Sequence, residues 1–170
     1  CSFGDASLNH ATAQAALNTT SHAAHQHLPV PLLFVCEDNG LGISVPSPEG
    51  WVAGTLSSRI DLRYETASGE DPESLLATAR ALADWVREHR RPAVLHLRTV
   101  RFLGHAGADV EAAYRTPHEV RADLDRDPLL ATARAAYCSA RPVSMACLLP
   151  WCRPGCHPRS SRLSPSPQSS

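Results

Sequence analysis

The chain has 170 residues, of which 43% are hydrophobic and 19% are charged, so it is long enough to form one domain with a buried core. Its formal net charge of −1 favours neither a nucleic-acid nor a membrane-surface partner, and no apolar run approaches the roughly 20 residues that a membrane span needs. Because no basic and then apolar segment opens the chain, we expect a cytoplasmic protein. It begins at Cys1, without a methionine and inside an apparent strand end, and we expect a fragment cut at its front.

The first part of the chain alternates strand and helix. We predict the end of a strand over Cys1–Phe3, a helix from Ser7 to about His27, and a second strand over Pro31–Cys36. The continuous apolar character of this second run is typical of a strand buried on both faces of a parallel sheet. A Gly- and Pro-rich loop is expected to follow, from Asn39 to about Gly54.

The clearest helix is predicted from Pro72 to about His89. Asp71 is suited to the N-cap position, proline is suited to the first helical position, and Pro92 ends the pattern. Apolar residues recur at helical spacing and predict one buried face, formed by Leu75, Leu76, Ala79, Leu82, Ala83 and Val86.

Another buried strand is expected over Ala93–Leu97, followed by a polar loop from Arg101 to Thr116 and a last helix that starts near Pro117. Strands that alternate with helices predict an α/β fold, in which a parallel sheet carries helices on both faces.

The composition changes near Tyr137. No acidic residue follows Asp127, and residues 138–170 hold four of the six cysteines and six of the 14 prolines. We therefore predict one domain over residues 1–137 and a Pro/Ser/Cys-rich disordered tail over residues 138–170. The spacing of the tail cysteines fits a zinc site poorly. A shifted reading frame, which sequencing the coding DNA would reveal, is one explanation of the change.

Polar residues follow the first two predicted strands. In a right-handed βαβ unit these strands lie parallel, so Asp5 and Asn39 are expected at the same carboxyl edge, where open α/β sheets bind ligands. A carboxylate, an amide oxygen and the main-chain carbonyl of Leu41 would supply three of the oxygen ligands that Mg²⁺ prefers. The free N–H groups at the start of the Ser7 helix favour an anion. The residues alone therefore predict a site for Mg²⁺ with a diphosphate.

Two motifs carry a family resemblance. Gly4-Asp5-Ala6-Ser7-Leu8-Asn9, followed after a helix by Glu37-Asp38-Asn39, resembles the thiamine-diphosphate motif. Arg98-Thr99-Val100-Arg101-Phe102-Leu103-Gly104-His105, followed by Asp109 and by Tyr114-Arg115-Thr116, is similar to the active-site loop of one subunit type. That type is the alpha subunit (E1 component) of the pyruvate and branched-chain 2-oxo acid dehydrogenases.

The resemblance covers Cys1 to about Ala135 and implies a partial thiamine-diphosphate-binding fold. It implies oxidative decarboxylation of pyruvate or a branched-chain 2-oxo acid, with acyl transfer to a lipoyl-bearing E2 acyltransferase and with an E1 beta-type subunit or domain as partner. The implied cofactors are thiamine diphosphate and Mg²⁺. The Mg²⁺ ligands would be Asp5, Asn39 and Leu41. The residues in contact with the cofactors would be Gly4, Asp5, Ala6, Ser7, Asn9, Asn39, Leu41, Arg101 and His105.

The resemblance also implies roles for the loop. His105 would be the catalytic histidine over the thiazolium ring, and Arg101 would neutralise phosphate or hold the loop. Ala106 stands where the family has a phosphorylatable serine, so control by phosphorylation is expected to be absent. Ala6 replaces the last glycine of the first motif and Asp38 replaces the first of two asparagines.

Three functions are compatible with this sequence. The first is the E1 reaction, although the fragment alone is expected to be inactive because the beta part supplies a glutamate to the cofactor. The second is a non-catalytic remnant that keeps the fold. The third is another thiamine-diphosphate enzyme, such as a transketolase-like protein, which the His105 loop disfavours.

Overall fold

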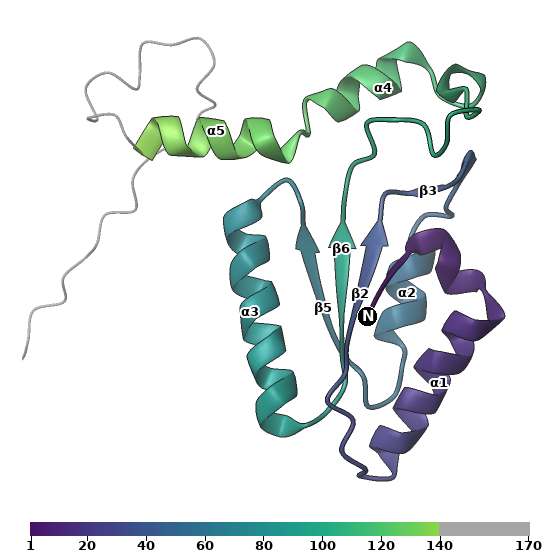
Figure 1. Ribbon diagram of the computed structural model, residues 1–170, viewed down its shortest axis with the longest axis vertical. Helices are drawn as coiled ribbons and strands as arrows, with labels where there is room; N and C mark the ends of the chain where they lie inside the picture. The colour runs from purple at the N-terminus through teal and green to yellow at the C-terminus, as the bar shows by residue number, and fades with distance from the viewer. Residues whose placement is uncertain (140–170) are drawn as a thin grey trace, which may run out of the picture. The chain divides into compact units, whose positions relative to one another are not determined.

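The computed structural model describes residues 1–139 (Figure 1). The chain divides into a compact unit, Cys1–Thr132, and a second unit, Ala133–Ser170. Of the second unit the structure describes only the end of a helix, so the predicted tail lies outside the described residues apart from its first two. None of the helices within residues 1–139 is both long enough and apolar enough to cross a membrane.

Strands and helices alternate along the described part of the chain. The strands are β1 Ser2–Gly4, β2 Leu33–Asp38, β3 Leu41–Gly42, β4 Val45–Pro46, β5 Arg63–Ser68 and β6 Ala93–Arg98. The α-helices are α1 Ala11–His25, α2 Trp51–Ser57, α3 Pro72–His89, α4 Pro117–Leu124 and α5 Pro128–Ser139. Two short 3-10 helices are η1 Asp5–Asn9 and η2 Glu111–Ala113.

The main sheet has four strands in the order β1-β2-β6-β5, and every neighbouring pair is parallel. The α/β fold and the parallel sheet are therefore confirmed. β1 pairs directly with β2, with Gly4 opposite Glu37. The segments that follow these two strands therefore start side by side at the carboxyl edge of the sheet, as the βαβ argument predicted.

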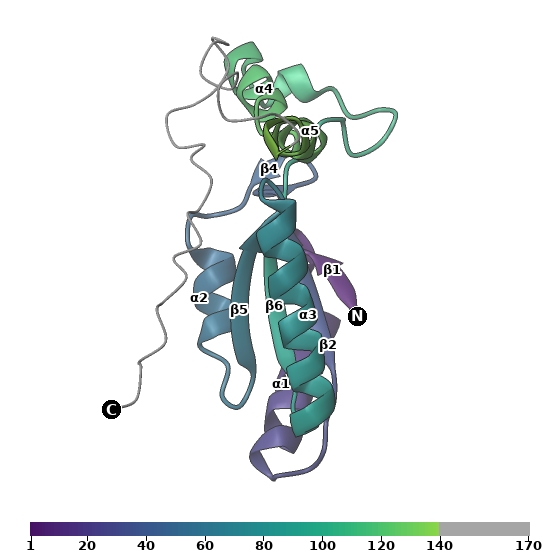
Figure 2. The same cartoon turned by 90° about the vertical axis from the view of Figure 1, so that its left-hand side faces the viewer.

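Each face of the sheet has its own hydrophobic core. The first core lies between the sheet and η1, α1 and α2, and its buried residues are Leu8, Leu17, Phe34, Cys36, Val52, Leu56, Leu62 and Val94. The second lies under α3, and its buried residues are Ala67, Leu82, Val86, Ala93 and Leu95. Figure 2 shows α2 and α3 on opposite sides of β5, which confirms the expectation of helices on both faces.

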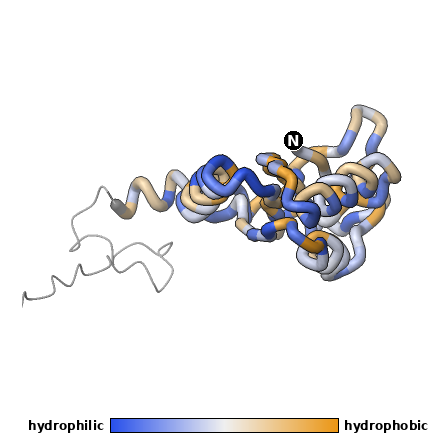
Figure 3. Tube along the Cα trace, turned by 90° about the horizontal axis from the view of Figure 1, so that it is seen from below, coloured by the Kyte–Doolittle hydropathy of each residue, from blue (hydrophilic) through white to orange (hydrophobic). Residues whose placement is uncertain are grey.

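The pattern along β2 shows why two cores form. Phe34 and Cys36 belong to the first core, whereas Leu33 and Val35 pack against the second. Successive side chains of a strand point to opposite faces, so a continuous apolar run serves both. The helices instead alternate hydrophobic and hydrophilic residues along their length (Figure 3), as one-sided burial requires.

Two boundary predictions were wrong and a third was confirmed at its start. The first helix begins at Ala11 rather than Ser7, because the 3-10 turn η1 comes first and His10 caps α1 by accepting a hydrogen bond from the Thr12 N–H at 3.3 Å. The expected loop from Asn39 to Gly54 contains the β3–β4 hairpin and the start of α2. The helix predicted to start near Pro117 does begin there as α4, and a further helix, α5, follows it.

One strand and one side chain also departed from the prediction. β5 was not predicted, because its sequence RYETAS carries charged residues and lacks a continuous apolar run. Such a sequence suits the edge position that β5 occupies in the sheet. Leu76, expected on the apolar face of α3, is 50% exposed, whereas Leu82 is 1% exposed.

These two leucines of α3 give a test of the second core. Leu82→Ala is expected to lower the free energy of unfolding by about 2–5 kcal/mol, since it leaves a cavity under the helix. Leu76→Ala, the same change at an exposed position of the same helix, is expected to change it by less than about 0.5 kcal/mol. Urea unfolding of the 170-residue chain followed by circular dichroism measures both. Equal losses in the two variants would contradict this placement of the core.

Candidate functional site

Asp5 begins η1 directly after β1 and is almost fully buried, with 3% of its surface exposed. Its carboxylate accepts a hydrogen bond from the Ser47 hydroxyl, in the segment after β4. Within residues 1–139, no arginine or histidine lies within ion-pair distance of this carboxylate. A buried carboxylate is costly unless a cation or several donors compensate it. The position therefore suits a bound cation.

Asn39 lies in the tight turn that follows β2. Its side-chain oxygen accepts a hydrogen bond from the Leu41 N–H at 3.0 Å, and the Asp38 carboxylate accepts one from the Gly40 N–H at 2.9 Å. Gly40 has a φ of +75°, a left-handed conformation that glycine adopts without strain. The two side chains and this glycine together define how the chain leaves β2 and enters β3.

The hairpin of β3 and β4 lies against the turn η1. A Cβ atom added to Gly42 would lie 3.0 Å from the Cβ of Ala6, closer than ordinary packing allows. Ala6, the residue that departs from the glycine of the family motif, is thus accommodated because position 42 has no side chain. The main chain of β3 is consequently held next to the turn that carries Asp5.

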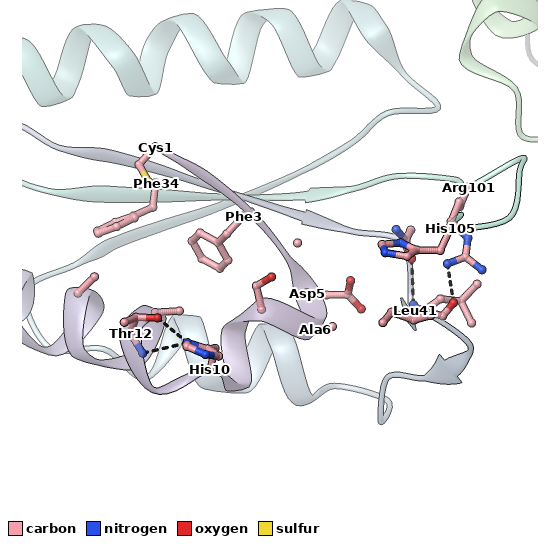
Figure 4. A pocket seen from close by; sticks show the side chains of 16 residues that line it. Cys1, Phe3, Asp5, Ala6, His10, Thr12, Phe34, Leu41, Arg101 and His105 are labelled. Atoms are coloured by element: carbon pink, nitrogen blue, oxygen red, sulfur yellow. Dashed lines mark hydrogen bonds between the residues drawn. The ribbon is translucent and has the colours of Figure 1, made fainter. Parts of the chain in front are cut away.

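A cavity of about 750 Å³ opens between the start of α1 and these loops (Figure 4). Ligand sites commonly have volumes of about 300–1,000 Å³. In Figure 4, Asp5, Leu41, Arg101 and His105 lie toward one end of this cavity, and His10 and Thr12 lie toward the other. Its lining includes predicted site residues from three separate segments, namely Gly4, Asp5, Ala6, Ser7, Asn39, Leu41, Arg101 and His105.

Asn9 is the one predicted cofactor residue that does not line this cavity. Its side-chain oxygen accepts a hydrogen bond from the Trp51 indole N–H at 2.8 Å, so it links η1 to α2. Its contact with a cofactor stays a prediction.

Arg101 holds the loop that follows β6, one of the two roles expected for it. Its guanidinium donates to the Ile43 carbonyl oxygen at 2.6 Å and to the Tyr114 hydroxyl at 2.5 Å. The guanidinium carbon also lies 5.8 Å from the centre of the Tyr114 ring, within the range of a cation–π contact. Arg101 therefore connects the β3–β4 hairpin to the far end of the His105 loop.

Asp109 orders the segment around His105. Its carboxylate accepts a hydrogen bond from the His105 N–H at 2.6 Å and one from the Tyr114 hydroxyl at 2.8 Å. The His105 amide hydrogen bond is the main cause that holds the pKa of Asp109 below its ordinary value of 3.8, and the Tyr114 hydroxyl and the Arg101 charge add to it. The imidazole of His105 is exposed on this loop.

The structure adds polar residues that the sequence pattern did not indicate. Ser47 reaches Asp5 from a Gly- and Pro-rich segment in which no local signal marks it. On the sheet, Asp38 contacts His96 at 2.7 Å, and His96 contacts the Tyr64 hydroxyl at 2.8 Å. The departure at Asp38 was visible in the sequence, but its partners come from β5 and β6 and have no local signal.

Among residues 1–139, no three His, Cys, Asp or Glu side chains are grouped so that they could hold a metal ion. The predicted Mg²⁺ ligands contain only one carboxylate and take their other oxygens from an amide and from the main chain, so they are not a set of this kind.

Comparison with known proteins places the chain in a family. The family model described as "Dehydrogenase E1 component" matches residues 1–137. The chain belongs to the dehydrogenase E1 component family. The resemblance stated from the two motifs is thereby confirmed.

Curated relatives of this E1 chain are alpha subunits. It is 32% identical over 132 residues to the pyruvate dehydrogenase E1 component subunit alpha of Zymomonas mobilis, which covers 75% of this chain and 35% of that protein. It is 30% identical over 136 residues to the corresponding subunit of Rickettsia felis, covering 75% and 38%. It is 27% identical over 131 residues to the 2-oxoisovalerate dehydrogenase subunit alpha of Bacillus subtilis, also covering 75% and 38%. The chain thus spans little more than a third of the length of these relatives.

The role of Asp109 can be tested with an isosteric change. Asp109→Asn removes the negative charge of the side chain whose oxygen accepts the hydrogen bonds from His105 and Tyr114, and so weakens both bonds. Exchange of the His105 amide at neutral pH is therefore expected to rise on the order of tenfold. Hydrogen exchange measured by NMR reports this amide, and Asp125→Asn, at an exposed position of the same unit, is the control. Unchanged protection of His105 in Asp109→Asn would show that this carboxylate does not order the loop.

The pKa of Asp109 also sets the pH range over which the loop is ordered. A carboxyl group whose pKa is lowered by folding stabilises the folded state above its unfolded pKa, and this contribution is lost as the pH falls through the lower folded value. Protection of the His105 amide, corrected for intrinsic exchange, is therefore expected to stay constant from neutral pH down to the ordinary value of 3.8 and to fall only below it. Loss of protection near neutral pH would point to a different group.

Proposed function

We propose that this chain forms part of the alpha component of a 2-oxo acid dehydrogenase and holds Mg²⁺ and the diphosphate of thiamine diphosphate. The observation that carries the proposal is the cavity at the carboxyl ends of β1 and β2. It gathers the buried carboxylate of Asp5 with Asn39 and Leu41, and the loop residues Arg101 and His105 line the same space.

The residues fit a divalent cation and an anion in one place. Asp5 is a buried carboxylate without a cationic side chain in ion-pair distance among residues 1–139. The Asn39 side-chain oxygen accepts one hydrogen bond, from Leu41, and an amide oxygen has a second lone pair to offer. With a main-chain carbonyl these are the hard oxygen donors that Mg²⁺ takes, and phosphate oxygens and water usually complete its shell.

The other end of the cavity suits the rest of a long ligand. Ala13 and Ala16 on α1 contribute small side chains to the lining, so the wall leaves room near the main chain. His10 and Thr12 at the start of α1 add polar groups close to the positive end of the helix dipole. The small residues leave room for a ligand, and the helix start favours a negatively charged group.

Thiamine diphosphate, when bound, supplies the carbanion chemistry that breaks the bond between the carboxylate and carbonyl carbons of a 2-oxo acid. His105 presents an exposed imidazole at the cavity, where it can hold or move a proton. Arg101, Asp109 and Tyr114 fix the loop that carries this imidazole. The protein's part is therefore to position groups around the reacting atoms.

The reaction proposed for the whole enzyme is oxidative decarboxylation with transfer of the acyl group to a lipoyl-bearing E2 acyltransferase. An E1 beta-type subunit or domain would complete the site. Relatives named for pyruvate and for 2-oxoisovalerate match the chain to similar extents, so both substrates are kept in the proposal.

Calorimetry tests the cofactor proposal. Thiamine diphosphate is titrated with Mg²⁺ into the 170-residue chain mixed with a beta-type subunit, and heat of binding is expected for the wild type. Asp5→Asn keeps the shape of the side chain and removes its charge, so Mg²⁺ affinity is expected to fall on the order of 100-fold. Glu37→Gln, an exposed charge change on the neighbouring strand, is the control and should bind as the wild type does.

Each variant first needs the circular dichroism spectrum of the wild type, to show that it is folded. Absence of binding by the wild type in every mixture would overturn the proposal and favour a non-catalytic remnant. Equal binding by Asp5→Asn and the wild type would show that Asp5 does not ligate the metal.

A further inference from the structure

A chain of polar side chains crosses three strands on the face of the sheet that carries the first hydrophobic core. The Tyr64 hydroxyl on β5 lies 2.8 Å from His96 Nδ1 on β6. His96 Nε2 lies 2.7 Å from Asp38 Oδ2 at the end of β2. The other carboxylate oxygen, Asp38 Oδ1, accepts the Gly40 N–H at 2.9 Å. These hydrogen bonds thus connect β5, at one edge of the sheet, to the turn that contains Asn39.

The direction of these hydrogen bonds follows from the groups. A carboxylate oxygen accepts hydrogen bonds, so the contact with Asp38 fits a tautomer in which the Nε2–H of His96 donates a hydrogen bond to Asp38. Nδ1 is the acceptor in the tautomer that fits these contacts, and the Tyr64 hydroxyl donates to it. Burial is the main cause that raises the pKa of Tyr64, which keeps this hydroxyl protonated. Both the imidazole and the Gly40 amide therefore converge on Asp38.

The surroundings make this arrangement costly unless every group is paired. His96 is only 4% exposed, and the Asp38 side chain is 18% exposed. Phe34, Cys36 and Val94 on the same face are buried and apolar. A polar group in such a place is destabilising when a partner is lost, whereas an apolar side chain would pack without that demand. The hydrogen bonds that join Tyr64, His96 and Asp38 therefore favour one conformation of the turn after β2 over others.

The turn itself has a second anchor to the same strands. The Thr99 N–H donates to the Asp38 main-chain carbonyl at 2.7 Å, just beyond the end of β6. Asp38 is thus held through both its main chain and its side chain. Asn39, the next residue, has its side-chain oxygen directed to the Leu41 N–H. Its position depends on where Asp38 is held.

We propose that His96 and Tyr64 are positioning residues for the proposed Mg²⁺ site, because they fix Asp38 and through it the turn that presents Asn39 and Leu41. The part of this inference that concerns the metal rests on the proposed function. The part that concerns the shape of the turn does not. Partners behind the groups that ligate a metal commonly change its affinity by about 10- to 100-fold when they are removed.

Three variants separate the contributions of the hydrogen bonds among Tyr64, His96 and Asp38. His96→Leu removes both contacts of the imidazole. His96→Gln keeps a side-chain N–H that can donate to Asp38, and it lacks the second ring nitrogen that meets Tyr64. Tyr64→Phe removes only the last donor. Glu37→Gln is the matched control, because Glu37 neighbours Asp38 on β2 but is exposed and outside the chain of hydrogen bonds.

Hydrogen exchange of the Gly40 and Leu41 amides in the 170-residue chain is the first readout and needs no cofactor. His96→Leu is expected to speed their exchange on the order of tenfold, with a smaller change in Tyr64→Phe and partial recovery in His96→Gln. The amides of Leu82 and Val86 in α3, whose side chains belong to the second core, report any loss of global stability. Faster exchange at Gly40 that merely equals the change in α3 would overturn the inference.

Mg²⁺ affinity, measured by calorimetry with thiamine diphosphate and a beta-type subunit, is the second readout. His96→Leu is expected to weaken it on the order of 10- to 100-fold, and His96→Gln is expected to restore part of the loss. Wild-type affinity in His96→Leu would overturn the inference while leaving the proposed function intact. If the wild type itself does not bind Mg²⁺, the proposed function fails and the positioning of a metal site fails with it, while the exchange data still decide what shapes the turn.

Discussion

The parallel pairing of β1 with β2 is the constraint on which the rest of the site depends. It places Gly4 opposite Glu37, so the residues after each strand leave the sheet at the same edge. Asp5 on η1 and Asn39 in the turn after β2 then line one cavity, although a whole helix separates them in sequence. Without this pairing, neither residue would have a neighbour with which to form a site.

Around this edge the polar groups divide into two sets. Asp5 is buried and bound to the hydroxyl of Ser47, whereas His105 is exposed on a loop tied down by Asp109. Arg101 joins the two regions, since it binds the Ile43 carbonyl of the hairpin and the Tyr114 hydroxyl beyond His105. A site that holds an ion and also transfers protons needs a fixed charge in its wall, which Asp5 supplies. It also needs an ordered but accessible imidazole, which His105 supplies.

The sequence predicted those features that short-range patterns encode. The apolar run of β2, the capped helix α3 and the two motifs were enough to predict a parallel sheet and to name eight of the sixteen residues that line the cavity. β5 and the 3-10 turn η1 were not predicted, because an edge strand mixes charged with apolar residues and a short 3-10 turn has no periodicity of its own. The partners Ser47 and His96 lie 42 and 58 positions from Asp5 and Asp38, a separation at which only the fold brings residues together.

The contact between β3 and η1 limits how this site can vary. Gly42 meets the methyl group of Ala6 so closely that an added Cβ atom would lie 3.0 Å away, and both residues belong to segments that border the cavity. A larger residue at either position has to be matched by the smallest residue at the other, or the hairpin moves away from the turn that carries Asp5. The sizes of residues 6 and 42 are therefore coupled in this structure, and an added methyl group at position 42 requires the hairpin or the η1 turn to shift.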